Sequence, residues 1–276
     1  MCRWLAYSGD PIALEEAIFK PKHSLIDQSV SSTMISVPTN GDGFGVGWYN
    51  GKGEPGIFRS IRPAWNDRNL REIAHHIESG LFLAHVRRTT HAPVQMSNCH
   101  PFRYGKWLFV HNGLIYAYDK IHRDLLMAID PDLFPALQGS TDSELIFFLA
   151  LTFGLEKGPI GALEKAIGLV EKLSRAAGID HPIQMTIGVV DGKTLWGFRY
   201  SSEGNSRTLF YSSDISAMRE LYPNYERLKI APTNARGIAS EPLSELKGGW
   251  NTVPESTAVV VCDGKVELLP FSPSSP

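Results

Sequence analysis

The chain has 276 residues, of which 43% are hydrophobic and 20% are charged, and its formal net charge is −2. These values are ordinary for a globular protein that can bury a core of normal size. Proteins that bind nucleic acid or anionic membranes usually carry a clustered basic surface, and this balance gives no sign of one, so we expect neither partner.

Three cysteines, Cys2, Cys99 and Cys262, lie far apart along the chain. An odd and scattered set is not a disulfide framework, and reduced thiols are typical of a cytoplasmic protein. The first ten residues, MCRWLAYSGD, lack the basic stretch and long apolar run of a signal peptide. No stretch approaches the roughly 18 consecutive apolar residues of a membrane helix. We therefore expect a cytoplasmic location.

Short runs rich in β-branched and aromatic residues predict many strands. In chain order, these runs are Cys2–Tyr7, Gly43–Tyr49, Leu81–Arg87, Trp107–His111, Met185–Val190, Thr194–Tyr200, Thr208–Tyr211, Arg227–Ala231, Thr257–Cys262 and Val266–Leu269. Apolar residues at helical spacing predict helices. These stretches are Ile12–Phe19, Asn66–Glu78, Tyr118–Ala128, Asp142–Phe153, Ile160–Ala177 and Ile215–Leu221.

The two longest predicted helices lie together in the middle of the chain, with strands before and after them. Thr141 precedes the first of them and Glu144 follows three residues later, which is a capping-box pattern. Because strands and helices do not alternate, we expect an α+β fold with antiparallel sheets rather than a doubly wound one. No linker divides the chain, so we expect one domain over residues 1–270 and a disordered tail over residues 271–276.

Cys2 is the first candidate for chemistry because it directly follows Met1. Methionine aminopeptidases remove Met1 when the second residue is small, and this leaves a thiol and a free α-amine on one residue. With a pKa of about 7.7–8.0, the α-amine is partly neutral at pH 7 and can act as the base for the thiol. The alternative is an inert cysteine, since free cysteine is among the most buried residue types.

Further candidates lie at the ends of predicted elements. Arg87 and Arg88 end a strand, where alternation would put them on opposite faces. Two arginines at a strand end could be surface charges, whereas a single inward arginine could grip a carboxylate. Asn112-Gly113 is a strong hairpin-turn signal, but the two residues could instead form an oxyanion hole. Asp142 lies in the first turn of a helix, where a favourable interaction with the helix dipole would by itself explain an acidic residue.

The run from Asn40 to Trp48 has glycine at every second position, which strips one strand face of side chains. Such a face allows another backbone or a ligand to approach closely. The run lacks the Lys-Ser/Thr of a P-loop and does not match a dinucleotide-binding pattern.

A zinc-dependent hydrolase is the alternative chemistry. The chain supplies residue types that zinc prefers, namely His85, His91, Cys99, His100 and His111. Their spacing matches neither an HExxH helix nor paired CxxC motifs, so we expect no metal and no other cofactor.

The order of these motifs is more specific than any one of them. It comprises an N-terminal Met-Cys, an H-x-R-x-x-T-H strand end, an N-x-H-P segment, an H-N-G sequence and a T-D-S-E helix start. The series resembles class II glutamine amidotransferases, which are N-terminal nucleophile hydrolases with a four-layer αββα sandwich of two mostly antiparallel sheets. The pieces MCRWLAYSG, NGDGFGVGWY and ASEPL are similar to the stand-alone, YafJ-like branch. Its relatives include γ-glutamyl amidohydrolases of ergothioneine synthesis and glutathione breakdown.

The resemblance, which extends from Met1 to about Leu269, implies the catalytic roles. Cys2 would be the nucleophile and its α-amine the general base, while Asn112 and Gly113 would form the oxyanion hole. The enzyme would cleave the γ-amide of glutamine or of a γ-glutamyl small molecule through a γ-glutamyl thioester.

The resemblance also implies how the substrate is held. Arg87 would bind its α-carboxylate and Asp142 its α-ammonium group, and Thr90 and His91 would belong to a loop that covers glutamine. One departure is Arg88, because the glucosamine-phosphate synthase branch has tryptophan there. Arg88 is therefore a candidate for contacting a polar or anionic leaving group.

The synthase or transferase domain of the large family members is absent from this sequence, so a separate protein could accept ammonia. Two other classes of function stay open at this stage. One is a binding or scaffold protein that has kept the fold without catalysis, and the other is the zinc hydrolase.

Overall fold

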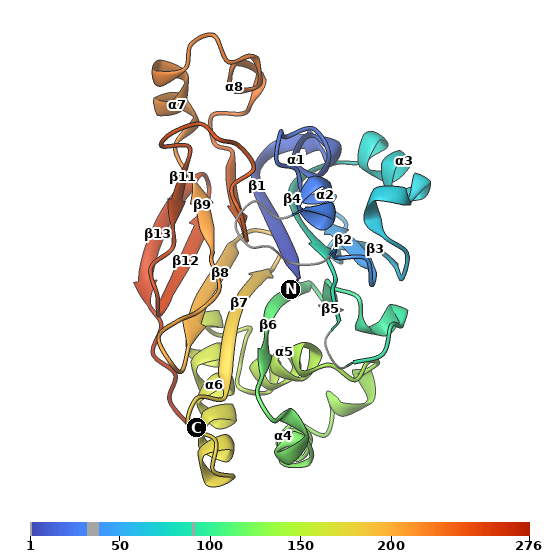
Figure 1. The fold of residues 1–276 in the computed structure, drawn as a ribbon, viewed down its shortest axis with the longest axis vertical. Coiled ribbons are helices and arrows are strands. Elements are labelled where there is room, and N and C mark those ends of the chain that lie inside the picture. The colour runs from blue at the N-terminus through green and yellow to red at the C-terminus, as the bar shows by residue number, and fades with distance from the viewer. Residues whose placement is uncertain (1, 32–38, 90–91) are drawn as a thin grey trace.

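The computed structural model describes residues 2–31, 39–89 and 92–276, and these form two sheets flanked by helices (Figure 1). One sheet has seven strands in the order β11-β9-β10-β1-β4-β2-β3. Their bounds are β1 (Arg3–Ala13), β2 (Phe44–Trp48), β3 (Gly56–Ser60), β4 (Glu78–Val86), β9 (Phe210–Ser212), β10 (Arg236–Ala239) and β11 (Trp250–Thr252).

The other sheet has six strands in the order β13-β12-β8-β7-β6-β5. Their bounds are β5 (Phe102–Tyr104), β6 (Trp107–Ile115), β7 (Ile183–Val190), β8 (Leu195–Ser201), β12 (Thr257–Cys262) and β13 (Lys265–Pro270). The strand pairs that the structure describes in both sheets are antiparallel, as expected.

The two sheets pack face to face, and helices cover the outer face of each. Successive side chains of a strand point to opposite faces. In β1, Trp4 and Ala6 enter the core between the sheets, whereas Leu5 and Tyr7 enter the core beneath the outer helices. The seven-stranded sheet is covered by α1 (Glu15–Ile18), α2 (Leu25–Val30) and α3 (Arg68–His76), and the six-stranded sheet by α4 (His122–Met127), α5 (Asp142–Thr152) and α6 (Pro159–Ala176). This arrangement confirms the predicted four-layer αββα sandwich.

Two short helices, α7 (Ile215–Leu221) and α8 (Glu226–Ile230), project from one end of the molecule, at the top of Figure 1. The prediction of a strand over Arg227–Ala231 was wrong, because α8 occupies it. Periodicity cannot distinguish a short apolar run in a strand from one in a helix. The Arg227 side chain donates to the Glu16 carbonyl at 2.5 Å, which ties α8 to α1. Four 3₁₀ turns complete the elements, at Ala64–Asn66, Met96–Asn98, Tyr118–Lys120 and Phe134–Ala136.

Helix α5 begins at the predicted residue. The Thr141 hydroxyl accepts a hydrogen bond from the Glu144 backbone N–H at 3.1 Å. The Glu144 carboxylate, however, accepts from the backbone N–H groups of Gln138 and Gly139 at 3.1 and 2.6 Å. Half of the predicted capping box is therefore present, and Glu144 orders the loop before the helix instead.

The glycines of β2 allow close packing, as the alternating pattern predicted. A Cβ atom at Gly45 would overlap the carbonyl oxygen of His100, and one at Gly47 would overlap the Leu108 side chain. The segment around His100 can therefore lie directly against β2.

Residues 271–276, where the sequence predicted a disordered tail, lie along α6. The Phe271 side chain is 1% exposed and packs in the core against Phe198, with ring centroids 5.3 Å apart. The Ser274 backbone N–H donates to the Glu164 carbonyl at 3.2 Å. These contacts differ from the expectation because one aromatic ring anchors an otherwise Ser/Pro-rich segment.

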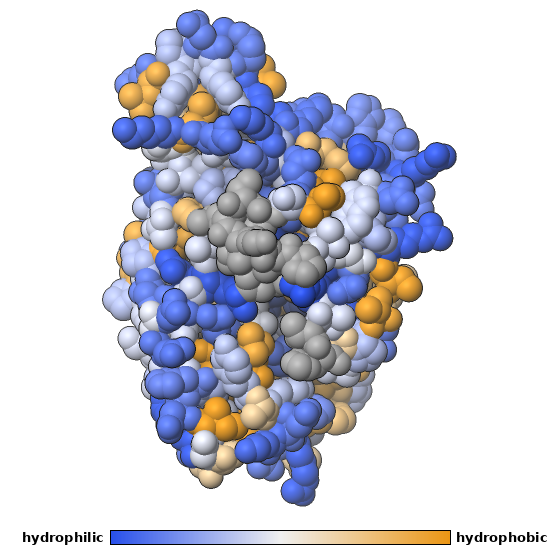
Figure 2. All heavy atoms as spheres, viewed as in Figure 1, coloured by the Kyte–Doolittle hydropathy of each residue, from blue (hydrophilic) through white to orange (hydrophobic). Residues whose placement is uncertain are grey.

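On the face shown in Figure 2, most of the described surface is hydrophilic, and apolar residues are scattered in small groups. Single exposed apolar residues are normal for a protein surface. Within the described ranges, no helix combines the length and apolar character needed to cross a membrane.

We expect Phe271→Ala to destabilise the protein by about 3–5 kcal/mol, because a fully buried ring is replaced by a cavity. Urea unfolding followed by circular dichroism would measure the change. Leu268→Ala is the matched control, because this neighbouring side chain is 39% exposed and should cost far less. Equal effects of the two changes would mean that the tail does not dock on α6 in solution.

Candidate functional site

A cavity of about 480 Å³ lies where the start of β1 meets the ends of β4 and β6 and the start of α5. We call it the Cys2 cavity. It brings together four of the seven residues to which the family resemblance assigns roles, namely Cys2, Arg87, Gly113 and Asp142. Thr90 and His91 lie outside the described residues.

The pairing of β1 positions Cys2. Because β1 runs antiparallel to β4 with Arg3 opposite Val86, the residue before β1 lies beside the residues that follow β4. The Cys2 Sγ atom is 3.4 Å from both the backbone N and the carbonyl O of Arg88. Burial raises the pKa of the Cys2 thiol. The thiol therefore needs a base to become a nucleophile near neutral pH.

Both arginines after β4 line the Cys2 cavity. Strand alternation had predicted opposite faces for Arg87 and Arg88, but β4 ends at Val86, so the alternation does not extend to them. Both residues therefore contribute to the wall of the cavity.

The Arg87 guanidinium is buried among carbonyl groups. Its terminal nitrogens lie 3.4–3.5 Å from the carbonyl oxygens of Asp42, Ala92 and Pro93, and the residue is 3% exposed. No carboxylate among the described residues forms an ion pair with it. A buried cation without an anionic partner is costly, so this site favours an anionic ligand.

Asn112 and Gly113 lie within β6 and pair with Thr186 and Met185 of β7. The hairpin turn considered from the sequence is therefore wrong, because the β6–β7 ladder overrides the local turn preference. Gly113 lines the Cys2 cavity. Asn112 lines a second, adjoining polar pocket together with Arg3, the residue after Cys2.

Asp142 joins the start of α5 to the end of β6. One carboxylate oxygen accepts from the Ile115 backbone N–H at 2.9 Å, and the other accepts from the Ser143 hydroxyl at 3.1 Å. The Ser143 oxygen lies 2.8 Å from Nδ1 of His111. Ser143 was not singled out from the sequence, and its place between Asp142 and Glu144 in the T-D-S-E motif was the available signal.

A layer of buried histidines lies beside the cavity. The rings of His85 and His100 stack with centroids 4.2 Å apart, and His111 is also buried. Burial lowers the pKa of all three, that of His85 to about 3. These side chains are therefore neutral near pH 7. Across the part of the chain that the structure describes, no three His, Cys, Asp or Glu side chains are grouped as metal ligands.

The cavity can accommodate an amino acid that carries both an α-carboxylate and an α-ammonium group. A buried guanidinium and a carboxylate face the same cavity, and a thiol lies in its wall. Such a set can bind an α-carboxylate and an α-ammonium group while a nucleophile reaches the side chain.

Comparisons with known proteins agree with this geometry. Residues 35–275 match the family model of the class II glutamine amidotransferases. A Saccharomyces cerevisiae protein named as a glutamine amidotransferase is 35% identical over 98% of this chain and 84% of its own. The γ-glutamyl-hercynylcysteine sulfoxide hydrolase of Mycobacterium tuberculosis is 34% identical over 97% of this chain and 96% of its own.

A solved structure of a glutamine aminotransferase class-II domain protein from Silicibacter pomeroyi is 32% identical to this chain. The two superpose with a TM-score of 0.73 over 99% of this chain and 100% of the other. The family match covers most of the chain, and the relatives align along nearly all of it. The chain therefore belongs to the class II glutamine amidotransferases, a family of amide-cleaving enzymes.

Proposed function

We propose that this enzyme hydrolyses the γ-amide of glutamine or of a γ-glutamyl compound, with Cys2 as its nucleophile. The observation that carries the proposal is the shared cavity of the Cys2 thiol, the Arg87 guanidinium and the Asp142 carboxylate. Arg87 binds the α-carboxylate of the substrate, since a guanidinium can grip a carboxylate through two hydrogen bonds. Asp142 holds the α-ammonium group, and Thr90 and His91 belong to the segment that covers the substrate.

The reaction proceeds through a thioester once Met1 has been removed. The α-amine of Cys2 takes the thiol proton, and Sγ forms a bond to the γ-carbonyl carbon. The carbonyl oxygen gains negative charge, which the Asn112 amide and the Gly113 backbone N–H stabilise. The C–N bond then breaks, and the proton held by the α-amine passes to the leaving nitrogen. Water cleaves the S–C bond, which releases glutamate and restores the thiol. These steps require neither a metal nor an organic cofactor.

The names of the relatives support two kinds of leaving group. The Mycobacterium tuberculosis relative is named for a large γ-glutamyl compound, and the Saccharomyces cerevisiae relative for glutamine. Both kinds share the glutamyl end that Arg87 and Asp142 would bind. Alternatively, the substrate is glutamine, and the released ammonia passes to a separate acceptor protein. The free thiols of Cys2, Cys99 and Cys262 support a cytoplasmic location.

Cys2→Ala is expected to abolish glutamate release from glutamine and from γ-glutamyl compounds, because no other group replaces the thiol. A coupled glutamate assay measures release, and intact mass should show that the active wild type lacks Met1. Cys99→Ala and Cys262→Ala are the matched controls and should retain most activity. Full activity in Cys2→Ala, or in a chain that keeps Met1, would contradict the proposal. A wild type that is inactive on every compound would favour the scaffold alternative.

Asn112→Ala is expected to lower kcat by roughly 100- to 1,000-fold, the usual loss when one oxyanion donor is removed. The KM value should change much less, because the donor acts mainly on the charge of the transition state. Steady-state kinetics on one γ-glutamyl substrate would separate the two parameters. An unchanged kcat would assign Asn112 to the β6–β7 ladder alone.

Arg87→Lys is expected to raise KM clearly, because lysine keeps the charge but loses the planar fork. Arg88→Lys, which changes the neighbouring cation in the same cavity, should have the smaller effect on KM for glutamine. Glutamine carries only the α-carboxylate, so the comparison isolates recognition of that group. A larger effect of Arg88→Lys would mean that Arg88, and not Arg87, binds the α-carboxylate.

A further inference from the structure

A second polar pocket lies beside the Cys2 cavity, and we call it the Arg207 pocket. Its volume is about 210 Å³. Its walls come from β1, β6, β7 and the segment between β8 and β9, and include Arg3, Asn112, Gln184, Asn205, Arg207 and Thr208. Arg3 follows Cys2 and Asn112 precedes Gly113, so two of its residues are chain neighbours of residues in the Cys2 cavity.

The two sites are connected through Cys2 itself. The Arg3 guanidinium donates to the carbonyl oxygen of Cys2 at 2.9 Å. Burial lowers the pKa of Arg207, and the proximity of the Cys2 thiol group raises it. The Arg207 pocket thus adjoins Cys2, while Arg87 and Asp142 line the Cys2 cavity.

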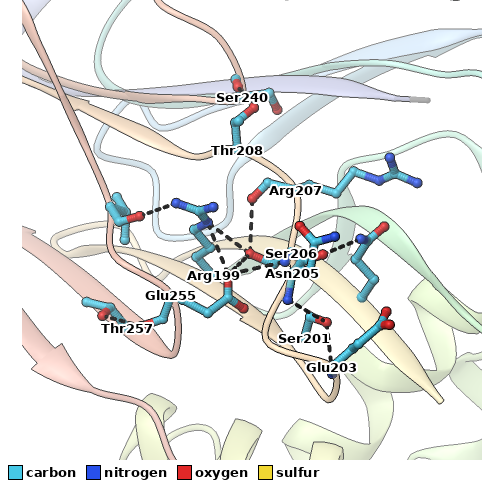
Figure 3. Close-up of polar contacts among 12 residues, drawn as sticks. Arg199, Ser201, Glu203, Asn205, Ser206, Arg207, Thr208, Ser240, Glu255 and Thr257 are labelled. Atoms are coloured by element: carbon cyan, nitrogen blue, oxygen red, sulfur yellow. Dashed lines mark hydrogen bonds and ion pairs between the residues drawn. The ribbon is translucent and has the colours of Figure 1, made fainter. Parts of the chain in front are cut away.

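The backbone on both sides of Arg207 is held firmly. The Ser206 hydroxyl accepts from Arg199 at 2.8 Å and donates to Glu255 at 2.5 Å. The Thr208 hydroxyl donates to the Ser240 carbonyl at 2.9 Å. Figure 3 shows these bonds around the segment. The position of the Arg207 main chain is therefore fixed by its neighbours.

The Arg207 guanidinium itself has no partner among the described residues. Its Nε atom is buried without a hydrogen bond, and no carboxylate of the described chain forms an ion pair with it. In Figure 3 its side chain extends away from the bonded group of Arg199, Ser206 and Glu255. An arginine stays charged in a protein, and a partly buried charge gains from an anionic partner. The pocket thus combines a fixed backbone with an unpaired, forked cation.

We propose that the Arg207 pocket is the leaving-group subsite, and that Arg207 selects γ-glutamyl compounds whose leaving amine carries a carboxylate or a similar anion. This inference rests on the proposed function. The glutamyl end occupies the Cys2 cavity, the scissile amide lies at Cys2, and the amine side extends past Asn112 towards Arg207. A planar guanidinium matches a carboxylate through two hydrogen bonds. The sequence had suggested Arg88 for this role, and the pocket geometry favours Arg207.

The test compares two substrates that differ in one charge. γ-Glutamyl-alanyl-glycine has a terminal carboxylate, and its C-terminal amide lacks that charge. γ-Glutamyl-glycine and its amide provide a second, shorter pair. The measured quantity is the ratio of kcat/KM values for acid and amide, in the wild type and in Arg207→Gln, Arg88→Gln and Arg68→Gln. Arg68 lies exposed on α3, outside both sites, and is the control for loss of one arginine.

We expect the wild type to prefer the acid of at least one pair by roughly 10- to 100-fold, the range for charge-assisted hydrogen bonds. Arg207→Gln should remove most of that preference, and its activity on the amide and on glutamine should fall much less. Arg207→Lys should keep part of the preference, since it keeps the charge without the fork. Arg68→Gln should resemble the wild type.

Three results would overturn the inference while the proposed function still stands. Equal kcat/KM values for acid and amide in the wild type would exclude a subsite that recognises an anion, but they would not contradict the proposed hydrolase activity. Loss of the preference in Arg88→Gln with retention in Arg207→Gln would assign the role to Arg88. An equal loss on all substrates in Arg207→Gln would make Arg207 a structural residue. If the wild type releases glutamate from no compound at all, the proposed function itself fails, and this inference fails with it.

Discussion

The position of β1 in the middle of the seven-stranded sheet is the constraint on which the site depends. β1 is hydrogen-bonded to β10 on one side and to β4 on the other. The indole of Trp4 also donates to the Thr186 hydroxyl of β7 at 3.0 Å, which ties the strand to the second sheet. A residue that directly precedes such a strand has little conformational freedom left to lose. The Cys2 thiol is therefore held beside the ends of β4 and β6 before any substrate arrives.

The arginines around Cys2 differ in whether a carboxylate of the protein pairs with them. Arg3 is paired with the buried Glu241, with 2.5 Å between the charged atoms. Arg87 and Arg207, by contrast, form no ion pair with the carboxylates that the structure describes. The neutral histidine layer adds no positive charge near pH 7. Two cations in the walls of separate pockets thus stay available for an anionic ligand.

The sequence alone predicted those elements whose signals are local. The start of α5 follows from the Thr141 cap, and the bounds of α7 and β12 agree with those predicted from apolar spacing. Pairing between distant strands is a tertiary effect, and it placed Asn112-Gly113 inside a ladder although the dipeptide favours a turn.

The candidate site was predictable to a similar extent. The order of short motifs indicated Cys2, Arg87 and Asp142, which are far apart in sequence but line one cavity. Arg207 could not be singled out from the sequence, because it lies in an irregular segment without periodicity. Its importance follows from the residues that surround it in the folded protein. Loop residues of this kind become visible when the walls of a pocket are known.

The alternation of Trp4 and Leu5 between two cores has a consequence for how related sequences can vary. A strand repeats every two residues, so the insertion or loss of one residue between Trp4 and Ala6 would exchange the faces of the residues before it. The indole of Trp4 would then point towards the outer helices, and the thiol would turn away from β6. Substitution of side chains along this segment should therefore be tolerated better than a change of its length by a single residue. The spacing between Cys2 and Trp4 should be among the least variable in the family.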